Sequence, residues 1–326
     1  MAPVFTGIAR AIGGFAFKAA GDSSPVEATG GTKYTYNGNV IHKFAADGTF
    51  ETPGAFLKDC EYIVVGGGGG GGADIGGGGG AGGYRTGTVP IGGGLTLDIT
   101  VGEGGTGGAR PTTPSTQGAN GEDSVLQLPT GSNPTPIVAD GGGWGRKGGT
   151  GGPGGCGGAG GGPGGPYAGG TGNTPPFTPP QGNPGGVGTG GAGAGGGGGG
   201  GGEAGKSPDS PTYPATGGPG GNGQPVPTTF HDPQNPVNPT SVPGDCSYAG
   251  PSNALAGGGG GGNWVASGAG GNGGAGGGGK GGPGTSPYDG EDGCPNTGGG
   301  GGGGGPSEPR RGGNGGDGVV YIAYAE

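Results

Sequence analysis

The sequence has few of the large apolar side chains from which protein cores are normally built. Leu, Ile, Val and Phe account for 39 of the 326 residues, about 12%, whereas a chain with less than roughly 20% rarely forms a conventional packed core. This scarcity excludes the α/β and TIM-barrel folds of most enzymes of this length. The chain instead contains 111 Gly and 33 Pro.

Charged and reactive side chains are also scarce. Lys and Arg number 13, no basic stripe is present and the formal net charge is −9, which argues against nucleic acid as a partner. No apolar run approaches the roughly 20 residues of a membrane span, so we expect no membrane insertion. The only histidines, His42 and His231, have no nucleophile or carboxylate at an informative spacing. We therefore expect neither enzymatic activity nor a cofactor.

The four cysteines are far apart and lack the CxxC spacing of a zinc site, so we expect no metal centre. A disulfide between Cys246 and Cys294 and four unpaired thiols are both compatible with the sequence, whose other cysteines are Cys60 and Cys156. The first twenty residues make a poor secretory signal, because Arg10 interrupts their apolar stretch. Export by a secretion pathway is therefore not indicated.

The high glycine content is typical of neither collagen nor a uniform disordered chain. Collagen requires Gly at every third position, but the sequence has an eight-glycine run at Gly195–Gly202 and no glycine in Thr228–Val242. The large apolar residues are also unevenly placed: residues 33–139 hold 21 of the 39, residues 140–317 hold 8, and Gly318–Glu326 is again strand-like. We expect one folded unit, in which the last nine residues close a sheet that begins upstream.

The first third contains the sequence patterns of antiparallel strands. Asn37-Gly38 separates two strand-like segments and supplies the positive φ angles of a hairpin turn. Leu95–Val101 alternates apolar and polar residues, as a half-buried strand requires. Cys60–Val65 is a short β-branched and aromatic run. These segments predict a small antiparallel sheet with one buried face.

Four apolar residues near the N-terminus would share one side of a helix, because they are spaced by three, four and three residues. Such a stripe would dock the chain to a partner or to its own oligomer, and a frayed terminus is the alternative. The four candidate docking residues are Phe5, Ile8, Ile12 and Phe15.

Much of the glycine-rich region has a period of three residues, with two glycines per step, as in Lys147–Ala159. A left-handed helix of the polyproline II type has three residues per turn, so such a repeat would leave two edges bare for close packing against neighbours. Uninterrupted glycine runs would then suit the interior and the two-glycine repeats the outer layers. The sequence predicts a mainly β chain plus a bundle of polyglycine II helices anchored by the sheet. The uninterrupted runs are Gly66–Gly72, Gly195–Gly202, Gly257–Gly262 and Gly298–Gly305.

Glycine-poor inserts between these runs carry aromatic residues among Pro, Ser, Thr and Asn. If the glycine segments form a rigid mount, these inserts become loops that resemble a recognition surface. Local packing of the same aromatics at the bundle ends is the alternative. The candidate contact residues are Phe177, Tyr213, Phe230, His231, Tyr248 and Tyr288.

Several segments together resemble the glycine-rich domain of bacteriophage tail-fibre and adhesin proteins. The resemblance rests on Gly38–Phe44, on Gly48–Phe50, on Tyr62–Val65 followed by seven glycines, and on Gly316–Ile322. It implies a polyglycine II sandwich whose distal loops bind a host cell-surface receptor, either a protein or a glycan. It also implies a place on the virion. The N-terminal stripe would then contact other virion proteins, or a second copy of the chain in a homo-oligomer.

The expected organisation has four parts: an N-terminal docking segment at 1–32, a β-rich anchor at 33–139, a glycine bundle with loops at 140–317 and a closing strand at 318–326. A structural virion component without receptor binding, such as a head fibre or decoration protein, is the first alternative. An extracellular structural or ice-binding protein is the second, but its flat face would need regular outward Thr, of which Thr150 is the only clear example.

Overall fold

The computed structural model describes most of the chain beyond residue 25. The N-terminal docking candidates Phe5, Ile8, Ile12 and Phe15 lie outside the described residues, as do Tyr213 and Tyr248. The part of the chain that is described contains no α-helix and one short 3-10 turn. It therefore has no helix that is long and apolar enough to cross a membrane. The described residues are 26–109, 117–128, 135–190, 193–210, 215–234, 237, 253–264, 268–306 and 310–326.

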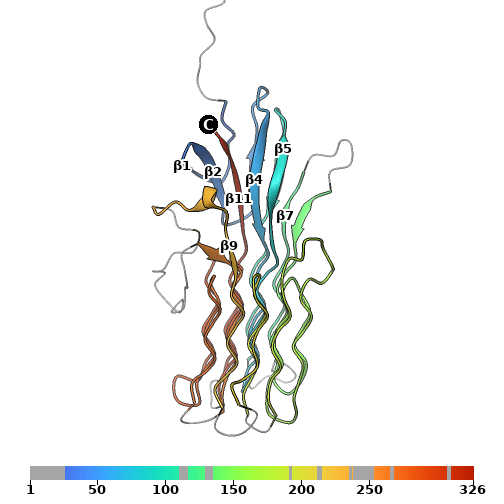
Figure 1. Cartoon of the computed structure of the whole chain (residues 1–326), viewed down its shortest axis with the longest axis vertical. Coiled ribbons are helices and arrows are strands. Elements are labelled where there is room, and N and C mark those ends of the chain that lie inside the picture. The colour runs from blue at the N-terminus through green and yellow to red at the C-terminus, as the bar shows by residue number, and fades with distance from the viewer. Residues whose placement is uncertain are drawn as a thin grey trace, which may run out of the picture.

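The molecule is elongated, with β-strands at one end and glycine-rich segments running side by side along its length at the other (Figure 1). The prediction of a mainly β chain with antiparallel sheets is confirmed. The larger sheet has five antiparallel strands in the order β1-β2-β11-β4-β5. Their bounds are β1 Thr32–Tyr36, β2 Asn39–Phe44, β11 Val319–Ala325, β4 Lys58–Val65 and β5 Tyr84–Ile91.

The hairpin between β1 and β2 has the predicted turn. Asn37 and Gly38 have φ angles of 50° and 73°, the positive values that a type I′ turn requires at both central residues. The C-terminal strand β11 lies between β2 and β4, with Val320 opposite Phe44 on one side and Val64 on the other. Residues from the two ends of the described chain are thus direct neighbours in the sheet.

A second, four-stranded antiparallel sheet has the order β3-β6-β7-β8. Its strand β6 corresponds to the alternating segment found in the sequence, with Leu97 and Ile99 buried and Thr96, Asp98 and Thr100 exposed. A short antiparallel pair, β9 with β10, and a single 3-10 turn, η1, complete the described elements. Their bounds are β3 Gly48–Glu51, β6 Thr96–Thr100, β7 Ser124–Leu126, β8 Ile137–Ala139, β9 Gln224–Pro225, β10 Ala254–Leu255 and η1 Thr228–Phe230.

The central strand β11 of the five-stranded sheet is buried on both faces, whereas the sequence predicted a sheet with one buried face. Val320, Ile322 and Tyr324 of β11 belong to the core cluster shared with the four-stranded sheet. Tyr321 and its alternate neighbours pack on the other face, under Phe230 and other residues of the insert between β9 and β10. The apolar residues of that insert are far from the sheet in sequence, so the pattern of the strands could not show that they cover it.

The glycine segments are joined to one another by backbone hydrogen bonds that rotate with a period of three residues. In the run Gly66–Gly72, the N–H groups donate to three neighbouring segments in turn. Residues 67 and 70 donate to the segment at 119–122, and residues 68 and 71 donate to the segment at 313–316. Residues 69 and 72 donate to the segment at 77–80. The carbonyls of the same residues accept in rotation from three other segments, at 142–145, 105–108 and 301–304. This run is therefore surrounded by six neighbours, and we call the set of laterally bonded segments the glycine array.

The spacing of the array admits no side chain at its interior positions. A Cβ atom added to Gly68, Gly71 or Gly198 would lie 1.9–2.0 Å from a carbonyl oxygen of an adjacent segment, far inside any van der Waals contact. Only glycine can therefore occupy these positions. The uninterrupted runs are buried throughout their central residues, where the sequence predicted them.

On parts of the outer surface of the array, the side chains at every third position accept hydrogen bonds from exposed backbone N–H groups. Asn272, Asn314 and Asp317 are exposed, as the two-glycine repeats predicted. The Asn314 and Asp317 side chains accept hydrogen bonds of 2.9 Å from the backbone N–H groups of Gly107 and Gly104. At the edge of the array no further glycine segment lies beside Gly104 and Gly107 to accept from their N–H groups. The two side-chain oxygens accept these hydrogen bonds instead, as a neighbouring carbonyl would in the interior.

The repeat at 147–159 departs from that prediction. Pro153 is exposed, but Cys156 and Ala159 are fully buried. The chain bends at residues 154–156 and folds back against its own first half, where the N–H of Gly158 donates to the Gly152 carbonyl, and Cys156 N–H donates to Ala81 inside the array. The side chains at every third position therefore face the solvent in the first half of this repeat and the interior of the array in its second half.

Candidate functional site

The array separates two sets of connecting turns. One set lies at the end far from the sheets, which we call the distal end; the other lies beside the sheets, at the end where the chain terminates (Figure 1). The turn at Ala73–Ile75 belongs to the distal end, because the glycine run that leaves β4 reverses there before it returns to β5. The candidate contact residues are divided between the two ends, so the structure does not bring them together into one site.

Tyr288 is the described candidate at the distal end. It is half-buried, and its backbone carbonyl accepts a hydrogen bond of 2.6 Å from Gly305 N–H. A polar cavity of about 400 Å³ lies beside it, lined by Asp289, Asp292, Arg311, Asn314 and nearby backbone. The Asp289 and Asp292 carboxylates already accept hydrogen bonds from the N–H groups of Arg311 and Asn314, at 2.8 and 2.6 Å. Their first role is thus to order this surface.

A buried charge cluster holds three distal turns together. The Asp74 carboxylate is almost fully buried and forms ion pairs with Lys147 and, at 3.3 Å, with Arg310. Asp74 N–H also donates to the Arg310 carbonyl. Asp74 and Ile75 both have positive φ angles, 55° and 62°, a backbone that is uncommon for an aspartate and rarer still for a β-branched residue. The tight reversal at the end of the glycine run is therefore stabilised by side chains from other turns.

Phe230 and His231 lie beside the five-stranded sheet and serve its packing. Phe230 has no exposed surface and packs against Tyr321 with ring centroids 5.7 Å apart. The His231 Nε2 atom is 2.9 Å from the Val226 carbonyl, which orders the same turn. The interpretation of Phe230 as an exposed contact residue is wrong for the folded chain, because its ring covers one face of the sheet.

Phe177 lies at the sheet end, in a loop that many hydrogen bonds hold in place. The Arg85 guanidinium stacks over its ring at 4.4 Å from the centroid. The Asn173 side chain accepts from the N–H groups of Phe177 and Gln181, at 3.0 and 3.2 Å. Gln181 in turn bonds to the buried Asp140 in both directions, through its amide and through Asp140 N–H. Burial raises the pKa of Asp140. The loop is thus a rigid wall of the structure beside β5.

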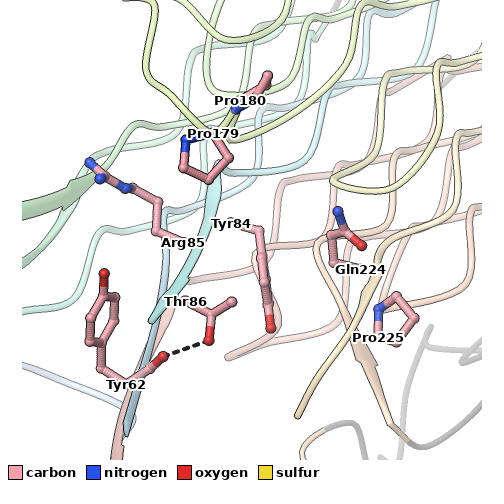
Figure 2. Close-up of a pocket in the computed structure, with 8 residues that line it drawn as sticks. All are labelled: Tyr62, Tyr84, Arg85, Thr86, Pro179, Pro180, Gln224 and Pro225. Atoms are coloured by element: carbon pink, nitrogen blue, oxygen red, sulfur yellow. Dashed lines mark hydrogen bonds between the residues drawn. The ribbon is translucent and has the colours of Figure 1, made fainter. Parts of the chain in front are cut away.

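A pocket of about 230 Å³ opens between this loop, the edge strand β5 and β9. We call it the lateral pocket (Figure 2). Its residues could not be expected from the sequence, because they come from four separate segments with no shared motif. One sequence feature could have pointed to the pocket: Tyr62 lies shortly before the glycine-rich stretch that starts at Gly66, and Tyr84 directly follows the end of that stretch. The lining residues are Tyr62, Tyr84, Arg85, Thr86, Pro179, Pro180, Gln224 and Pro225.

The cysteines of the described residues belong to no candidate metal-binding cluster. No group of three or more His, Cys, Asp and Glu in this part of the chain could bind an ion. Cys60 and Cys156 are free and buried, and burial raises the pKa of each thiol to about 12. Cys294 is disulfide-bonded, and Cys246 lies outside the described residues. Of the two sequence alternatives, the one with four unpaired thiols is therefore wrong.

These features define a glycine-rich β protein in which two antiparallel sheets continue into a backbone-bonded glycine array. The chain belongs to the glycine-rich domain family, which it matches over residues 44–325. No curated protein matches the chain in sequence. The family membership supports the glycine-rich part of the resemblance stated above.

Proposed function

We propose that the glycine array is a bundle of polyglycine II helices and that the chain is a bacteriophage virion adhesin whose distal loops bind a host cell-surface receptor. The observation that carries this proposal is the rotation of hydrogen bonds through six neighbours with a period of three residues. A left-handed helix with three residues per turn presents its groups in this order, whereas a β-ladder alternates with a period of two.

The close contacts inside the array support the same geometry. The Cα of an interior glycine directs a hydrogen toward the carbonyl oxygen that a Cβ would meet, as at Gly68 and Gly71. Such weak Cα–H···O contacts supplement the N–H···O bonds. Each ordinary bond contributes about 1 kcal/mol net, so stiffness arises from their number. A stiff array that holds its distal turns away from the sheets suits the display of a recognition surface.

Binding to cells tests this proposal directly. The purified chain should bind saturably to bacteria that support the phage and should compete with phage adsorption. The matched variants are Tyr288→Ala at the distal end and Phe177→Ala at the sheet end. We expect the distal substitution to weaken binding at least fivefold and the other to leave it unchanged.

Absence of binding to any susceptible cell, together with stable incorporation into particles, would instead favour the structural virion component. Equal effects of both substitutions would contradict a distal recognition surface. Thermal melting of both variants separates loss of contact from loss of fold.

A further inference from the structure

We propose that the polar cavity beside Tyr288 binds a neutral saccharide of the host surface through the Arg311 guanidinium and the Asp289 carboxylate. This inference rests on the proposed function and deepens it, because it names the chemical class of the receptor. The cavity, which we call the distal cavity, has a volume of about 400 Å³, within the range of roughly 300–1,000 Å³ that is typical of ligand sites. Its wall residue Gly108 lies against Ala73 of the distal turn.

Three outer segments of the glycine array form the walls of the distal cavity. Residues 107–109 and 289–292 flank the middle segment at 311–314. Backbone hydrogen bonds of 3.0 and 2.9 Å join the middle segment to the two flanking ones. The walls are therefore fixed before a ligand arrives, and little ordering is required on binding.

The row of outward side chains on the middle segment distinguishes Arg311 from the residues that follow it in the row. Asn314 and Asp317 accept hydrogen bonds from the N–H groups of Gly107 and Gly104, so both serve the edge of the array. Arg311 is the preceding member of this row, but a guanidinium has donors only and cannot accept from a backbone N–H. Its side chain forms no hydrogen bond or ion pair with any described residue. Because Arg311 is exposed and lines the cavity, its guanidinium N–H groups are available to a ligand.

The carboxylates of the distal cavity are held in place by backbone donors. Asp289 Oδ1 accepts from Arg311 N–H at 2.8 Å, and Asp292 Oδ1 accepts from Asn314 N–H at 2.6 Å. Asp289 Oδ2 has no hydrogen-bond partner among the described residues, so it is a fixed acceptor that a ligand can use. A hydroxyl both donates and accepts. A ligand with several hydroxyls can therefore bond to this carboxylate and to the guanidinium at once.

The lining favours a neutral saccharide over a peptide or an acidic ligand. Ala109 carries the only apolar side chain among the lining residues, whereas a protein ligand usually anchors a large side chain in a well-packed, desolvated pocket. Two carboxylates and one guanidinium give the cavity one net negative charge, which disfavours phosphate groups and acidic sugars. A neutral saccharide needs neither an apolar pocket nor a positive charge, because hydroxyls cover its surface. The rest of the lining is glycine backbone, which a ligand can approach closely: Gly107, Gly108, Gly290 and Gly312.

The first test identifies the chemical class of the receptor. Binding of the full chain to susceptible bacteria is measured after mild periodate oxidation, which cleaves sugars between neighbouring hydroxyl-bearing carbons, and separately after digestion of surface proteins with a protease. We expect periodate to abolish binding and the protease to leave it unchanged. Neutral polysaccharide isolated from the same cells should bind the chain and should compete with the cells.

The second test locates the site with the isolated polysaccharide as the probe. Arg311→Met should weaken its binding about tenfold, the size of one hydrogen bond to a charged group. Asp289→Asn retains an oxygen that accepts from Arg311 N–H, and it should weaken binding by about fivefold. Lys206→Met is the matched control, because it removes the same charge from an exposed side chain that does not line the cavity. It should bind as the unsubstituted chain does.

Both site variants should keep the melting temperature of the unsubstituted chain within about 2 °C, because surface substitutions of this kind change stability by at most about 0.5 kcal/mol. Loss of binding after the protease but not after periodate would overturn the inference and leave the proposed function standing. Equal affinity of Arg311→Met and the unsubstituted chain for the polysaccharide would likewise overturn the inference alone. Absence of binding to every susceptible cell would overturn the inference and the proposed function together.

Discussion

The substitution Gly198→Ala tests the packing of the glycine array at the scale of one methyl group. Gly198 lies within the run Gly195–Gly202, and an added Cβ would be 1.9 Å from the Gly79 carbonyl oxygen. Ordinary contact begins near 3.4 Å, so one segment must move by about 1.5 Å. No flexible side chain is available to move instead, because the group in the way is backbone.

That displacement breaks hydrogen bonds on both segments. Gly198 N–H donates to Gly259 at 2.8 Å, and its carbonyl accepts from Gly221 at 2.9 Å. Gly79 N–H donates to Gly301 at 2.8 Å, and its carbonyl accepts from Gly259 at 2.9 Å. The loss of two to four bonds, at about 1 kcal/mol each, combines with about 1–3 kcal/mol of overpacking strain. The free energy of unfolding should fall by roughly 3–7 kcal/mol.

Thermal unfolding followed by circular dichroism or calorimetry measures this effect. With roughly 2–4 °C per kcal/mol for a large domain, the melting temperature should fall by roughly 10 °C. Gly54→Ala is the matched control, since Gly54 is exposed and an added Cβ there meets nothing within 4 Å. It should change stability by less than about 0.5 kcal/mol. If both variants melt within about 2 °C of the unsubstituted chain, the array is not packed as closely as described.

Three further predictions concern the buried polar groups. Asp74→Asn removes the charge that pairs with Lys147 and Arg310, and urea denaturation should show a loss of roughly 3 kcal/mol; an unchanged midpoint would contradict a structural role for the cluster. Burial lowers the pKa of His42 below 6.5, so the unfolded chain binds the extra proton first. Stability should therefore decline as the pH falls below about 6.5, by at most about 1.4 kcal/mol per pH unit, and His42→Gln should flatten this part of the pH profile. The thiols of Cys60 and Cys156 have pKa values raised to about 12 by burial, so a thiol reagent at pH 8 should label them only after denaturation; rapid labelling of the folded chain would show that they are accessible.

The hydrogen bonds of His42 explain why its neutral form belongs to the fold. Its Nδ1 atom lies 2.7 Å from the Gly30 carbonyl, and Nε2 lies 3.4 Å from the Tyr324 hydroxyl. That hydroxyl accepts a bond of 2.8 Å from Ala28 N–H. The chain of contacts joins residues 28–30 to the two central strands, and a second proton on the ring would place another donor beside Tyr324.

The local patterns of the sequence were sufficient to predict several elements. Asn37-Gly38 predicted the hairpin, and the alternation of Leu97 and Ile99 predicted β6, because turn geometry and strand periodicity depend on neighbouring residues. The uninterrupted glycine runs were likewise expected in the interior. These conclusions needed no knowledge of distant contacts.

Distant contacts explain what the sequence could not show. Phe230 resembles a loop aromatic in sequence, but it covers the far side of Tyr321. Tyr84, Thr86, Pro179 and Gln224 meet only because β5, a loop and β9 lie at the same side of the molecule. Since glycine segments are chemically alike, their sequence does not specify which of them become neighbours.

The amino-acid sequence by itself thus determined where close packing is possible: wherever side chains are absent, backbones can approach to hydrogen-bonding distance. The tertiary structure decided which backbones meet, which third positions face outward and which face inward, as at Pro153 and Cys156. The physical reason is that hydrogen bonds between glycine segments are equally favourable for many pairings. The selection among these pairings is made by the turns, the buried ion pairs and the two sheets at one end.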